Sequence, residues 1–403
     1  MKSGGAFVRS LLWLVVAVLL SVASFAAHVT TTNSKTPAKK KVTESSRTQK
    51  RMTHVRHRAS VRRTSYTRRR FRERFYTSSF AEDQTEGDVT SGEDPVVRQA
   101  AIAALGNMNG TIVAIDPNSG RVLAMVNQKL ALAEGAQPCS TIKLAVALAG
   151  LGENVITRDT RINLNRRWSM DLTDALAHSN NPYFESVGRR LGFEKVSYYA
   201  HQFGLGELAG YQIEGEHLGT FPEEELDAKL GGVGKMCSFG ESISMTPLQL
   251  GALVSAIANG GTLYYLQHPT TPEEVASFSP RVKRHLDIAP LIPELQDGMA
   301  GAVSYGTARS VHENFSEEQI LGKTGTCSKD GTRFGWFASY ANTSYGRVVT
   351  VVFLQGGRST FGPKAAELGG KFYRNLYDQN FFSFRPPAPA GSTADVKSGA
   401  STQ

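Results

Sequence analysis

Ser140 and Lys143 are the residues of this sequence whose types and spacing best suit covalent chemistry. A serine hydroxyl is a weak nucleophile until a base removes its proton, and a nearby lysine held in its neutral form can act as that base. Pro138 precedes the pair, and an apolar run from Leu144 to Leu151 follows it. This pattern predicts that Ser140 lies in the first turn of a helix, with Lys143 one turn later on the same face. Free backbone N–H groups at such a helix start also stabilise an oxyanion formed there.

An S-x-x-K spacing is a weak signal when it stands alone, because it recurs by chance in long chains. Two further polar motifs follow it, Ser179-Asn180-Asn181 and then Lys323-Thr324-Gly325-Thr326. The first lies between two predicted helices and the second precedes a predicted strand, so the simpler interpretations are a capping turn and a polar strand end. The three motifs nevertheless stand in the order of a known active-site set.

With these motifs the chain resembles the transpeptidase domain of the penicillin-binding proteins, within the serine acyl-transferase and β-lactamase-like superfamily, from about residue 107 to residue 376. The resemblance implies an α/β (α+β) fold, in which a five-stranded antiparallel sheet is flanked by helices and joined to an all-helical subdomain. It also implies a short monofunctional protein without a glycosyltransferase domain, in which a tether replaces the folded pedestal of larger relatives.

The same resemblance implies a catalytic role for five residues. Ser140 would attack the carbonyl carbon of a D-Ala-D-Ala peptide and become acylated. Lys143 would be its base, and the second cation, Lys323, would lower the pKa of Lys143. Ser179 would pass a proton towards the leaving group, and Asn181 would hold the substrate amide.

Substrate binding is expected at the third motif. The hydroxyls of Thr324 and Thr326 would bind the terminal carboxylate of the peptide, and Gly325 would let the substrate backbone approach the strand. The backbone N–H groups of Ser140 and Thr326 would form the oxyanion hole. A β-lactam carries a similar carboxylate and acyl centre, so β-lactams are expected to acylate Ser140 and to inhibit the protein.

The sequence departs from the usual pattern of similar proteins next to the nucleophile. Cys139 stands where glycine is usual, and Ile142 stands where an aromatic residue is usual. Three cysteines, Cys139, Cys237 and Cys327, would allow one disulfide and one free thiol in an oxidising compartment. The simpler interpretation is that each is a small buried apolar residue. The alternative is a disulfide from Cys139 to Cys237 or Cys327 that stiffens or gates the cleft.

Local sequence signals predict the elements that position these residues. Asp94 as N-cap, Pro95 at the first helical position and Gly106 as the stop predict a helix from Pro95 to Leu105. A β-hairpin is predicted to follow, and helices are predicted on either side of the second motif. Two strands are expected after the third motif, the second of them central because it is apolar on both faces. These predicted elements comprise hairpin strands 111–115 and 122–126, helices 169–178 and 183–191, and strands 334–340 and 347–354.

Positive charge is concentrated in one stretch of the chain. Residues 35–74 hold sixteen Lys and Arg against two acidic residues, although the net charge of the whole chain is only +9. Aromatic residues lie among these arginines, as they do in some nucleic-acid-binding segments. The stretch has few large apolar residues, so it cannot bury a core. We therefore predict a disordered tether that meets anionic lipid or cell-wall polymer, and we expect no nucleic-acid partner.

The chain is predicted to divide into four segments. Residues 1–29 form a signal-anchor or a cleaved signal peptide, because an apolar run extends from Leu11 to Ala27. Residues 30–94 form a tether that is basic first and then acidic. Residues 95–384 form the catalytic domain, and the Pro/Ala/Gly/Ser-rich tail 385–403 is disordered. We expect the protein in the inner membrane, with its catalytic domain on the periplasmic or extracytoplasmic side.

The predicted function is that of a penicillin-binding D,D-transpeptidase that acts on peptidoglycan stem peptides through an acyl-serine intermediate in cell-wall synthesis. A D-Ala-D-Ala carboxypeptidase would share that intermediate. One alternative is a serine β-lactamase or β-lactam sensor, although Asn181 departs from the class D pattern and no class A glutamate motif can be placed. Another is a catalytically inactive scaffold that binds the cell wall. We predict no cofactor, and the nine histidines show no metal-binding spacing. No protein partner can be identified from these residues.

Overall fold

The computed structural model describes residues 73–384, apart from residues 166 and 344–345 and the side chain of Phe384. The chain divides into two compact units, residues 1–69 and 70–403, and the first of these lies outside the described residues. The predicted signal segment, the basic part of the tether and the C-terminal tail also lie outside them. Within the described ranges, no helix combines the length and the apolar character that crossing a membrane requires.

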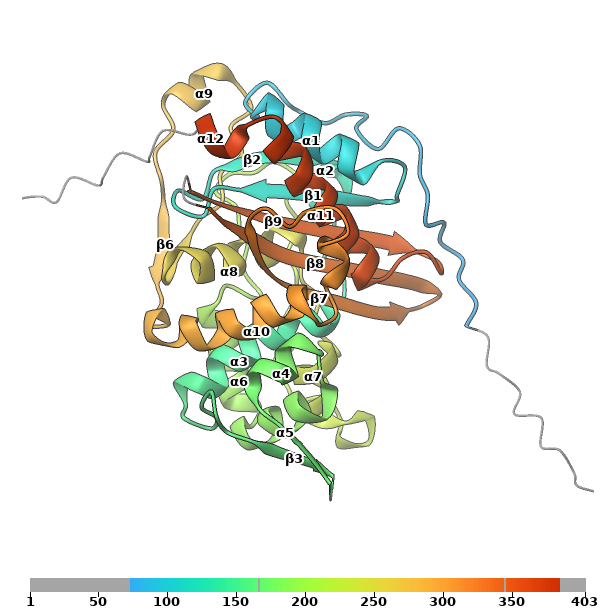
Figure 1. Cartoon of the computed structure of the whole chain (residues 1–403), viewed down its shortest axis with the longest axis vertical. Coiled ribbons are helices and arrows are strands. Elements are labelled where there is room, and N and C mark those ends of the chain that lie inside the picture. Colours follow the sequence, from blue (N-terminus) through green and yellow to red (C-terminus); the bar gives the residue numbers. More distant parts are fainter. Residues whose placement is uncertain (1–72, 166, 344–345, 385–403) are drawn as a thin grey trace, which may run out of the picture. The chain divides into compact units, whose positions relative to one another are not determined.

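A five-stranded antiparallel sheet forms the centre of the described unit (Figure 1). Its strand order is β2-β1-β9-β8-β7, so β9 is central and β7 lies at one edge. The predicted hairpin, the pairing of the two late strands and the central position of the second one are confirmed. The strands are β1 (Gly110–Ile115), β2 (Val122–Val126), β7 (Gln319–Lys329), β8 (Thr332–Thr343) and β9 (Gly346–Gly356).

Both faces of the sheet are covered by helices, which explains why β1 and the middle of β9 are apolar on both sides. On β1, Ile112 and Ala114 pack with α1 (Pro95–Leu105) and α11 (Gly362–Asp378) on one face. Val113 and Ile115 point to the opposite face, where α8 (Pro247–Asn259) lies. Successive residues of a strand face opposite sides of its sheet, so burial on both sides requires an apolar residue at every position.

Helix α1 confirms the predicted boundaries. The Asp94 side chain accepts hydrogen bonds from the N–H groups of Val96 and Val97, and Pro95 occupies the first helical position. Gly106 ends the helix with a φ of +57°, a value that glycine adopts readily. Local residues alone therefore specify both ends of this helix.

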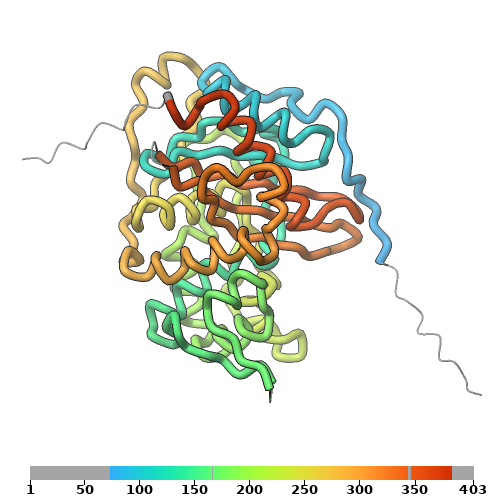
Figure 2. Tube along the Cα trace, in the orientation of Figure 1, coloured from blue at the N-terminus to red at the C-terminus, as the bar shows by residue number. Residues whose placement is uncertain are grey.

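A mainly helical region lies next to the β7 edge of the sheet (Figure 1). Figure 2 shows that the sheet strands come from the two ends of the described chain, whereas this region comes from its middle. The predicted helical subdomain is therefore present, and it also carries a two-stranded ribbon, β3 (Ile162–Asn165) with β4 (Trp168–Met170). Its principal helices are α3 (Lys143–Gly152), α4 (Leu172–Ala177), α5 (Asn181–Leu191), α6 (Phe193–Gln202), α7 (Gly232–Phe239) and α10 (Ile292–Ser304).

The remaining described elements are short. They comprise helices α2 (Gln128–Ala131), α9 (Pro272–Ala276) and α12 (Phe381–Phe384), the ribbon of β5 (Thr262–Tyr264) and β6 (Val282–His285), and the 3-10 turns η1 (Cys139–Ile142), η2 (Ala228–Leu230), η3 (Ala289–Leu291) and η4 (Arg309–Val311).

One predicted helix begins later than expected. The sequence prediction started it at Ser169, but Ser169 pairs with Asn163 in the β3–β4 ribbon. Helix α4 begins only after Asp171, whose carboxylate accepts a hydrogen bond from the N–H of Asp174. Aspartate is a favoured N-cap, and this capping bond marks the true start of the helix.

The folded unit also begins before the predicted boundary at residue 95. The Ser79 hydroxyl is buried, lies 3.0 Å from the Thr360 hydroxyl, and accepts a hydrogen bond from the N–H of Gly357. Asp88 and Glu93, which the sequence analysis assigned to an acidic tether, are buried beside Arg98 of α1. The acidic residues are therefore ordered here because a buried cation of the domain pairs with them.

We call this group, Asp88, Glu93, Arg98, Gln128 and His268, the N-terminal charge cluster. Two Arg98 nitrogens lie 2.8 Å from carboxylate oxygens of Asp88 and Glu93, and only 2% and 1% of those acidic side chains are exposed. Glu93 also lies 3.0 Å from Nε2 of His268 and accepts a hydrogen bond from Gln128. Burial alone would lower the pKa of Arg98, but the hydrogen bonds to the two carboxylates outweigh it and raise the pKa.

Candidate active site

Ser140 lies in the 3-10 turn η1, directly before α3. Pro138 closes this turn, because its carbonyl oxygen accepts hydrogen bonds from the N–H and the hydroxyl of Thr141, at 3.1 and 2.7 Å. Cys139 has a φ of +52°, in the left-handed region that side chains disfavour. The serine was predicted in an ordinary first helical turn, and the structure shows a tighter turn that leads into the helix.

Lys143 is the first residue of α3, and its ammonium nitrogen lies 2.9 Å from the Ser140 hydroxyl. The same nitrogen contacts three oxygens of the second motif. It lies 2.8 Å from the carbonyl oxygen of Ser179, 3.2 Å from the Ser179 hydroxyl and 2.5 Å from Oδ1 of Asn181. The Lys143 side chain is therefore fixed against the nucleophile and the second motif together.

The second motif both caps a helix and contacts Lys143. Asn180 caps α5, since its side chain accepts a hydrogen bond from the N–H of Tyr183. Its neighbours Ser179 and Asn181 instead contact Lys143. Ser179 has a φ of +55°, which turns the chain sharply between α4 and α5. The capping interpretation thus holds for the middle residue, while the flanking residues face the lysine.

Lys323 on the edge strand β7 also contacts Ser179. Its ammonium nitrogen lies 2.8 Å from the Ser179 hydroxyl and 3.0 Å from the carbonyl oxygen of Thr324. The Ser179 hydroxyl consequently bridges Lys143 and Lys323. The structure brings together all five residues for which a catalytic role was predicted.

Both lysines are fully buried, and no acidic side chain among the described residues forms an ion pair with either one. Burial, and then the nearby charge of Lys323, lowers the pKa of Lys143 well below its ordinary value. Burial also lowers the pKa of Lys323 to about 7. A buried ammonium group without a counter-ion favours its neutral form, and a neutral amine can accept a proton.

The hydroxyls of the third motif have protein partners of their own. Thr324 donates a hydrogen bond to the Thr307 hydroxyl at 2.6 Å, and the N–H of Gly362 donates to the Thr326 hydroxyl at 2.7 Å. The sequence analysis missed Thr307, which lies in the loop after α10 and belongs to no periodic pattern. The Gly306-Thr307 pair in that loop was the only local signal.

Gly325 has a packing role besides the one predicted for it. A Cβ atom at this position would lie 2.9 Å from the carbonyl oxygen of Pro138 and 3.3 Å from Cβ of Cys139. The missing side chain therefore lets the nucleophile turn η1 pack directly against strand β7. Contact between turn and strand is what places Ser140 beside the third motif.

A disulfide joins Cys139 to Cys327, with their Cα atoms 5.5 Å apart. Cys237 is a free, buried cysteine in α7, and burial raises the pKa of its thiol to about 12. The sequence left two interpretations of the cysteines open. Cys139 and Cys327 form a disulfide, whereas Cys237 is a small buried residue. Trp336 of β8 adds a second link, because its indole N–H donates to the carbonyl oxygen of Gln137 at 3.0 Å.

Two exposed rings that the sequence analysis did not single out lie beside the second motif and the loop that holds Thr307. His178 directly precedes Ser179, and its ring centre lies 5.5 Å from that of Tyr305. Tyr305 precedes Thr307 by two residues and donates a hydrogen bond to Asp174 at 3.2 Å. These rings are brought together by the meeting of α4 with the end of α10, which no local sequence pattern reports.

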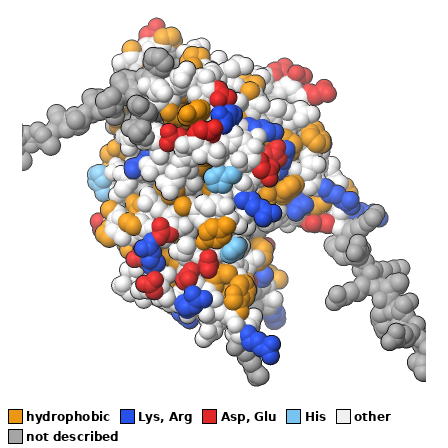
Figure 3. Space-filling model, viewed as in Figure 1, with side chains coloured by type: hydrophobic (Ala, Val, Ile, Leu, Met, Phe, Trp, Pro, Cys, Tyr) orange, Lys and Arg blue, Asp and Glu red, His pale blue; other side chains and the backbone are white. Residues whose placement is uncertain are grey.

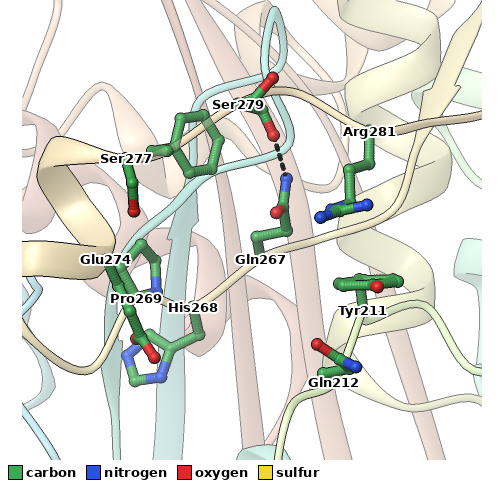
Figure 4. A pocket seen from close by; sticks show the side chains of 10 residues that line it. Tyr211, Gln212, Gln267, His268, Pro269, Glu274, Ser277, Ser279 and Arg281 are labelled. Carbon is green, nitrogen blue, oxygen red and sulfur yellow. Dashed lines mark hydrogen bonds between the residues drawn. The ribbon is translucent and has the colours of Figure 1, made fainter.

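A separate hollow of about 230 Å³ contains none of the motif residues (Figure 4). Figure 4 shows the Gln267 amide donating to the carbonyl oxygen of Ser279 near the centre of the view. To the right of this bond, the Arg281 guanidinium lies 4.1 Å from the centre of the Tyr211 ring. Figure 3 shows acidic and basic side chains interspersed over the face in view.

Among residues 73–384, apart from the gaps, no cluster of His, Cys, Asp and Glu has the arrangement of a metal site.

The fold and these contacts define a mixed α/β protein with a serine–lysine site at the edge of an antiparallel sheet. The sequence profile of the penicillin binding protein transpeptidase domain matches residues 110–375, which is well over half of the chain. The chain therefore belongs to the penicillin-binding protein transpeptidase family, as the sequence resemblance indicated.

Curated relatives carry names from cell-wall synthesis and sporulation. The chain is 30% identical to stage V sporulation protein D of Bacillus subtilis, covering 54% of this chain and 39% of that protein. It is 24% identical to the peptidoglycan D,D-transpeptidase MrdA of Haemophilus influenzae, covering 66% and 53%. It is also 24% identical to the peptidoglycan D,D-transpeptidase PbpA of Mycobacterium tuberculosis, covering 75% of each. The first two comparisons therefore span about half or less of the relative's length.

Solved structures share the fold at low sequence identity. The D,D-transpeptidase domain of a peptidoglycan glycosyltransferase from Eggerthella lenta aligns with a TM-score of 0.57 and 20% identity, covering 71% of this chain and 82% of that one. Pseudomonas aeruginosa PBP2, solved in complex with WCK 5153, aligns with a TM-score of 0.58 and 22% identity, covering 72% and 77%. These similarities establish the transpeptidase fold.

Proposed function

We propose that this protein is a penicillin-binding D,D-transpeptidase, which acts on D-Ala-D-Ala stem peptides of peptidoglycan through an acyl-serine intermediate. One observation carries the proposal: the Ser140 hydroxyl lies 2.9 Å from the nitrogen of a fully buried lysine that has no counter-ion among the described residues. Such a lysine favours its neutral form and can act as a base at neutral pH. The family and the names of its relatives support the substrate class.

Acylation begins when the neutral amine of Lys143 takes the hydroxyl proton of Ser140. The serine oxygen then attacks the carbonyl carbon of the penultimate D-Ala, and the carbonyl oxygen gains negative charge. Backbone N–H groups of Ser140 and Thr326 stabilise that charge in this proposal, since Ser140 is in turn η1 and Thr326 is on strand β7, which packs against η1. The hydroxyls of Thr324 and Thr326 donate to the terminal carboxylate of the substrate, for which the Thr324 hydrogen turns away from Thr307.

Collapse of the tetrahedral intermediate requires a proton for the departing D-Ala amine. The Ser179 hydroxyl bridges Lys143 and Lys323, so it can give its own proton to that amine and regain one from protonated Lys143, which returns the base to its neutral form. Asn181 holds the substrate amide. An amine of a second stem peptide then attacks the acyl-serine and forms a cross-link, whereas attack by water gives the carboxypeptidase reaction.

The proposed location is extracytoplasmic, with the N-terminal apolar segment as a membrane anchor or a signal peptide, because peptidoglycan stem peptides are cross-linked outside the cytoplasm. The apolar composition of residues 1–29, which lie outside the described residues, supports this location. Removal of that segment from the expressed protein, measured by N-terminal sequencing, would separate a cleaved signal peptide from an anchor.

The first test is intact-mass analysis of the full-length protein after exposure to benzylpenicillin, with Ser140→Ala in parallel. We expect a long-lived adduct on the wild type and none on Ser140→Ala. Rapid loss of the adduct with accumulation of hydrolysed drug would identify a β-lactamase instead. A wild type that forms no adduct would contradict the enzymatic proposal and favour a cell-wall-binding scaffold.

A second measurement separates the two fates of the acyl-enzyme. The wild type is incubated with a pentapeptide ending in D-Ala-D-Ala, with and without a D-amino acid as an acceptor amine, and the products are identified by mass. A transpeptidase gives the exchanged peptide as the main product when the acceptor is present. Accumulation of the tetrapeptide alone would assign the carboxypeptidase reaction.

A further inference from the structure

The Cys139–Cys327 disulfide lies between the two residues whose backbone N–H groups form the proposed oxyanion hole. Cys139 directly precedes Ser140, and Cys327 directly follows Thr326. Their Cα atoms are 5.5 Å apart, so the bond crosses the boundary between turn η1 and strand β7. The disulfide therefore limits how far the two N–H groups can move apart.

The backbone of Cys139 gives the bond a second consequence. Its φ of +52° lies in the left-handed region, where an L side chain is disfavoured and glycine is not. The Cys139 side chain is fully buried against the sheet. The disulfide fixes the Cys139 side chain in this buried position. The bond can therefore hold the turn in a backbone conformation that cysteine does not favour.

Packing of the residues that precede Cys139 leaves little room for a different turn. The carbonyl oxygen of Pro138 would lie 2.9 Å from a Cβ atom placed on Gly325. The indole N–H of Trp336 binds the carbonyl oxygen of Gln137 at 3.0 Å. The two residues that precede Cys139 thus contact the sheet directly, and a shift of Cys139 would displace Ser140 with it.

We propose that the Cys139–Cys327 disulfide is a positioning element of the active site, which holds turn η1 against strand β7 and makes acylation of Ser140 depend on the oxidised state. Cys139 and Cys327 act as positioning residues because neither one contacts the reacting atoms in this scheme. The inference rests on the proposed acyl-serine function and adds a redox requirement to it.

The redox step is an ordinary exchange with a dithiol. A thiolate of the dithiol attacks a sulfur of the bridge, with Cys327 the more accessible partner since Cys139 is fully buried. The second thiolate of the dithiol then attacks the mixed disulfide and frees the cysteine. Two electrons and two protons thus pass to Cys139 and Cys327, and the dithiol becomes a disulfide. Formation of the bridge is the reverse exchange, with a disulfide-donating oxidoreductase as the oxidant.

The test measures acylation of the full-length protein by a fluorescent penicillin, separating the dissociation constant of the initial complex from the acylation rate constant. The wild type is assayed oxidised and after reduction with dithiothreitol. We expect reduction to lower the rate constant about 10- to 100-fold, because small displacements of oxyanion donors have effects of this order. The dissociation constant should change less than about threefold, since the binding hydroxyls are not displaced.

Variants at Cys139 provide the matched comparison. Cys139→Ala removes the bridge but keeps a Cβ atom at a φ of +52°, whereas Cys139→Gly removes the bridge and relieves that conflict. We expect Cys139→Gly to be acylated faster than Cys139→Ala, with neither responding to reductant. Cys327→Ala should behave like reduced wild type, and Cys237→Ala, which removes the free thiol, should keep the wild-type response.

The outcomes distinguish this inference from the proposed function. Equal acylation of oxidised and reduced wild type, or a Cys139→Ala variant as fast as the oxidised wild type, would overturn the positioning role. A bridge with only a structural role would also overturn it. In that case all unbridged variants would have lower thermal midpoints, but Cys139→Gly would be acylated no faster than Cys139→Ala. Absence of acylation in every variant and redox state would instead contradict the proposed function.

Discussion

Lys143 and Lys323 are fully buried without an ion-pair partner among the described residues, whereas Arg98 is partly buried, with 13% of its side chain exposed, and lies 2.8 Å from each of two buried carboxylates. The surroundings have opposite effects on the pKa values. Burial lowers the pKa of both lysines, and the carboxylates of the N-terminal charge cluster raise that of Arg98. The same physical cost of burial therefore produces reactive amines at one site and a fixed cation at the other.

We therefore assign the unpaired cations to the proposed chemistry and the paired cation to folding. A paired buried cation is difficult to remove, since its carboxylates would be left uncompensated. An unpaired lysine that favours its neutral form contributes little Coulombic energy, but it can exchange a proton with Ser140 or Ser179. Substitutions at the two sites should accordingly separate loss of activity from loss of stability.

The largest effect is expected for Lys143→Met. Removing the general base should lower the acylation rate about 10²- to 10⁴-fold. The free energy of unfolding should change by less than about 2 kcal/mol, because an apolar side chain of similar length replaces a buried amine. Stopped-flow acylation and urea unfolding measure the two quantities. A variant that acylates at the wild-type rate would remove Lys143 from the mechanism.

Arg98→Met should give the opposite result. It leaves Asp88 and Glu93 buried without their cation, so we expect a loss of about 3–5 kcal/mol in the free energy of unfolding. Acylation by the remaining folded protein should stay within about threefold of wild type, since Arg98 is outside the active site. Arg189→Met is the matched control because Arg189 is exposed and only partly covered by its i,i+4 partner Glu185, and such pairs contribute less than about 1 kcal/mol.

The lysines should also give stability a distinct pH dependence. The folded-state pKa of Lys323 is about 7, whereas an unfolded lysine has a pKa of about 10.4, so the unfolded state binds more protons between these values. Stability should rise with pH across this window, by at most about 1.4 kcal/mol per pH unit for this group. Urea unfolding at pH 7, 8 and 9 measures the slope. Lys323→Met should reduce the slope, with the remainder coming from Lys143, and Arg98→Met should leave it unchanged.

The smallest effect is expected at Thr307, which contacts the substrate-binding motif rather than the buried amines. Thr307→Val removes the hydroxyl that accepts the hydrogen bond of Thr324. We expect a 2- to 10-fold weaker initial complex with penicillin, equivalent to one hydrogen bond of about 0.5–1.5 kcal/mol, and an acylation rate constant close to wild type. A change confined to the rate constant would instead connect Thr307 to proton transfer. Thr220→Val, at an exposed threonine, is the control.

Sequence reasoning succeeded where the deciding signals are local. The ends of α1 follow from Asp94, Pro95 and Gly106, and the central position of β9 follows from its uninterrupted apolar run. The structure also brings Ser140 and Lys143 together with the second and third motifs. Their assembly could be expected because three short motifs in a fixed order are rarely coincidental.

The features that sequence reasoning missed depend on partners far away in the chain. In the sequence, Asp88 and Glu93 resemble a solvated acidic linker. Only the fold shows that their side chains are buried and pair with Arg98. Thr307 becomes recognisable only when the end of α10 meets β7. The pairing of Cys139 was left open between two partners, because only the packing of η1 on β7 decides between Cys237 and Cys327.

The disulfide also changes the connectivity of the chain. It closes a covalent ring across a sequence separation of 188, and this ring contains helices α3 to α10, whereas β1, β2, β8 and β9 lie outside it. Closing a ring of this size reduces the entropy of the unfolded chain by an amount worth about 5 kcal/mol of stability. A protease that cuts one surface loop within the ring would leave a single covalent molecule, which migrates as two fragments only on a reducing gel.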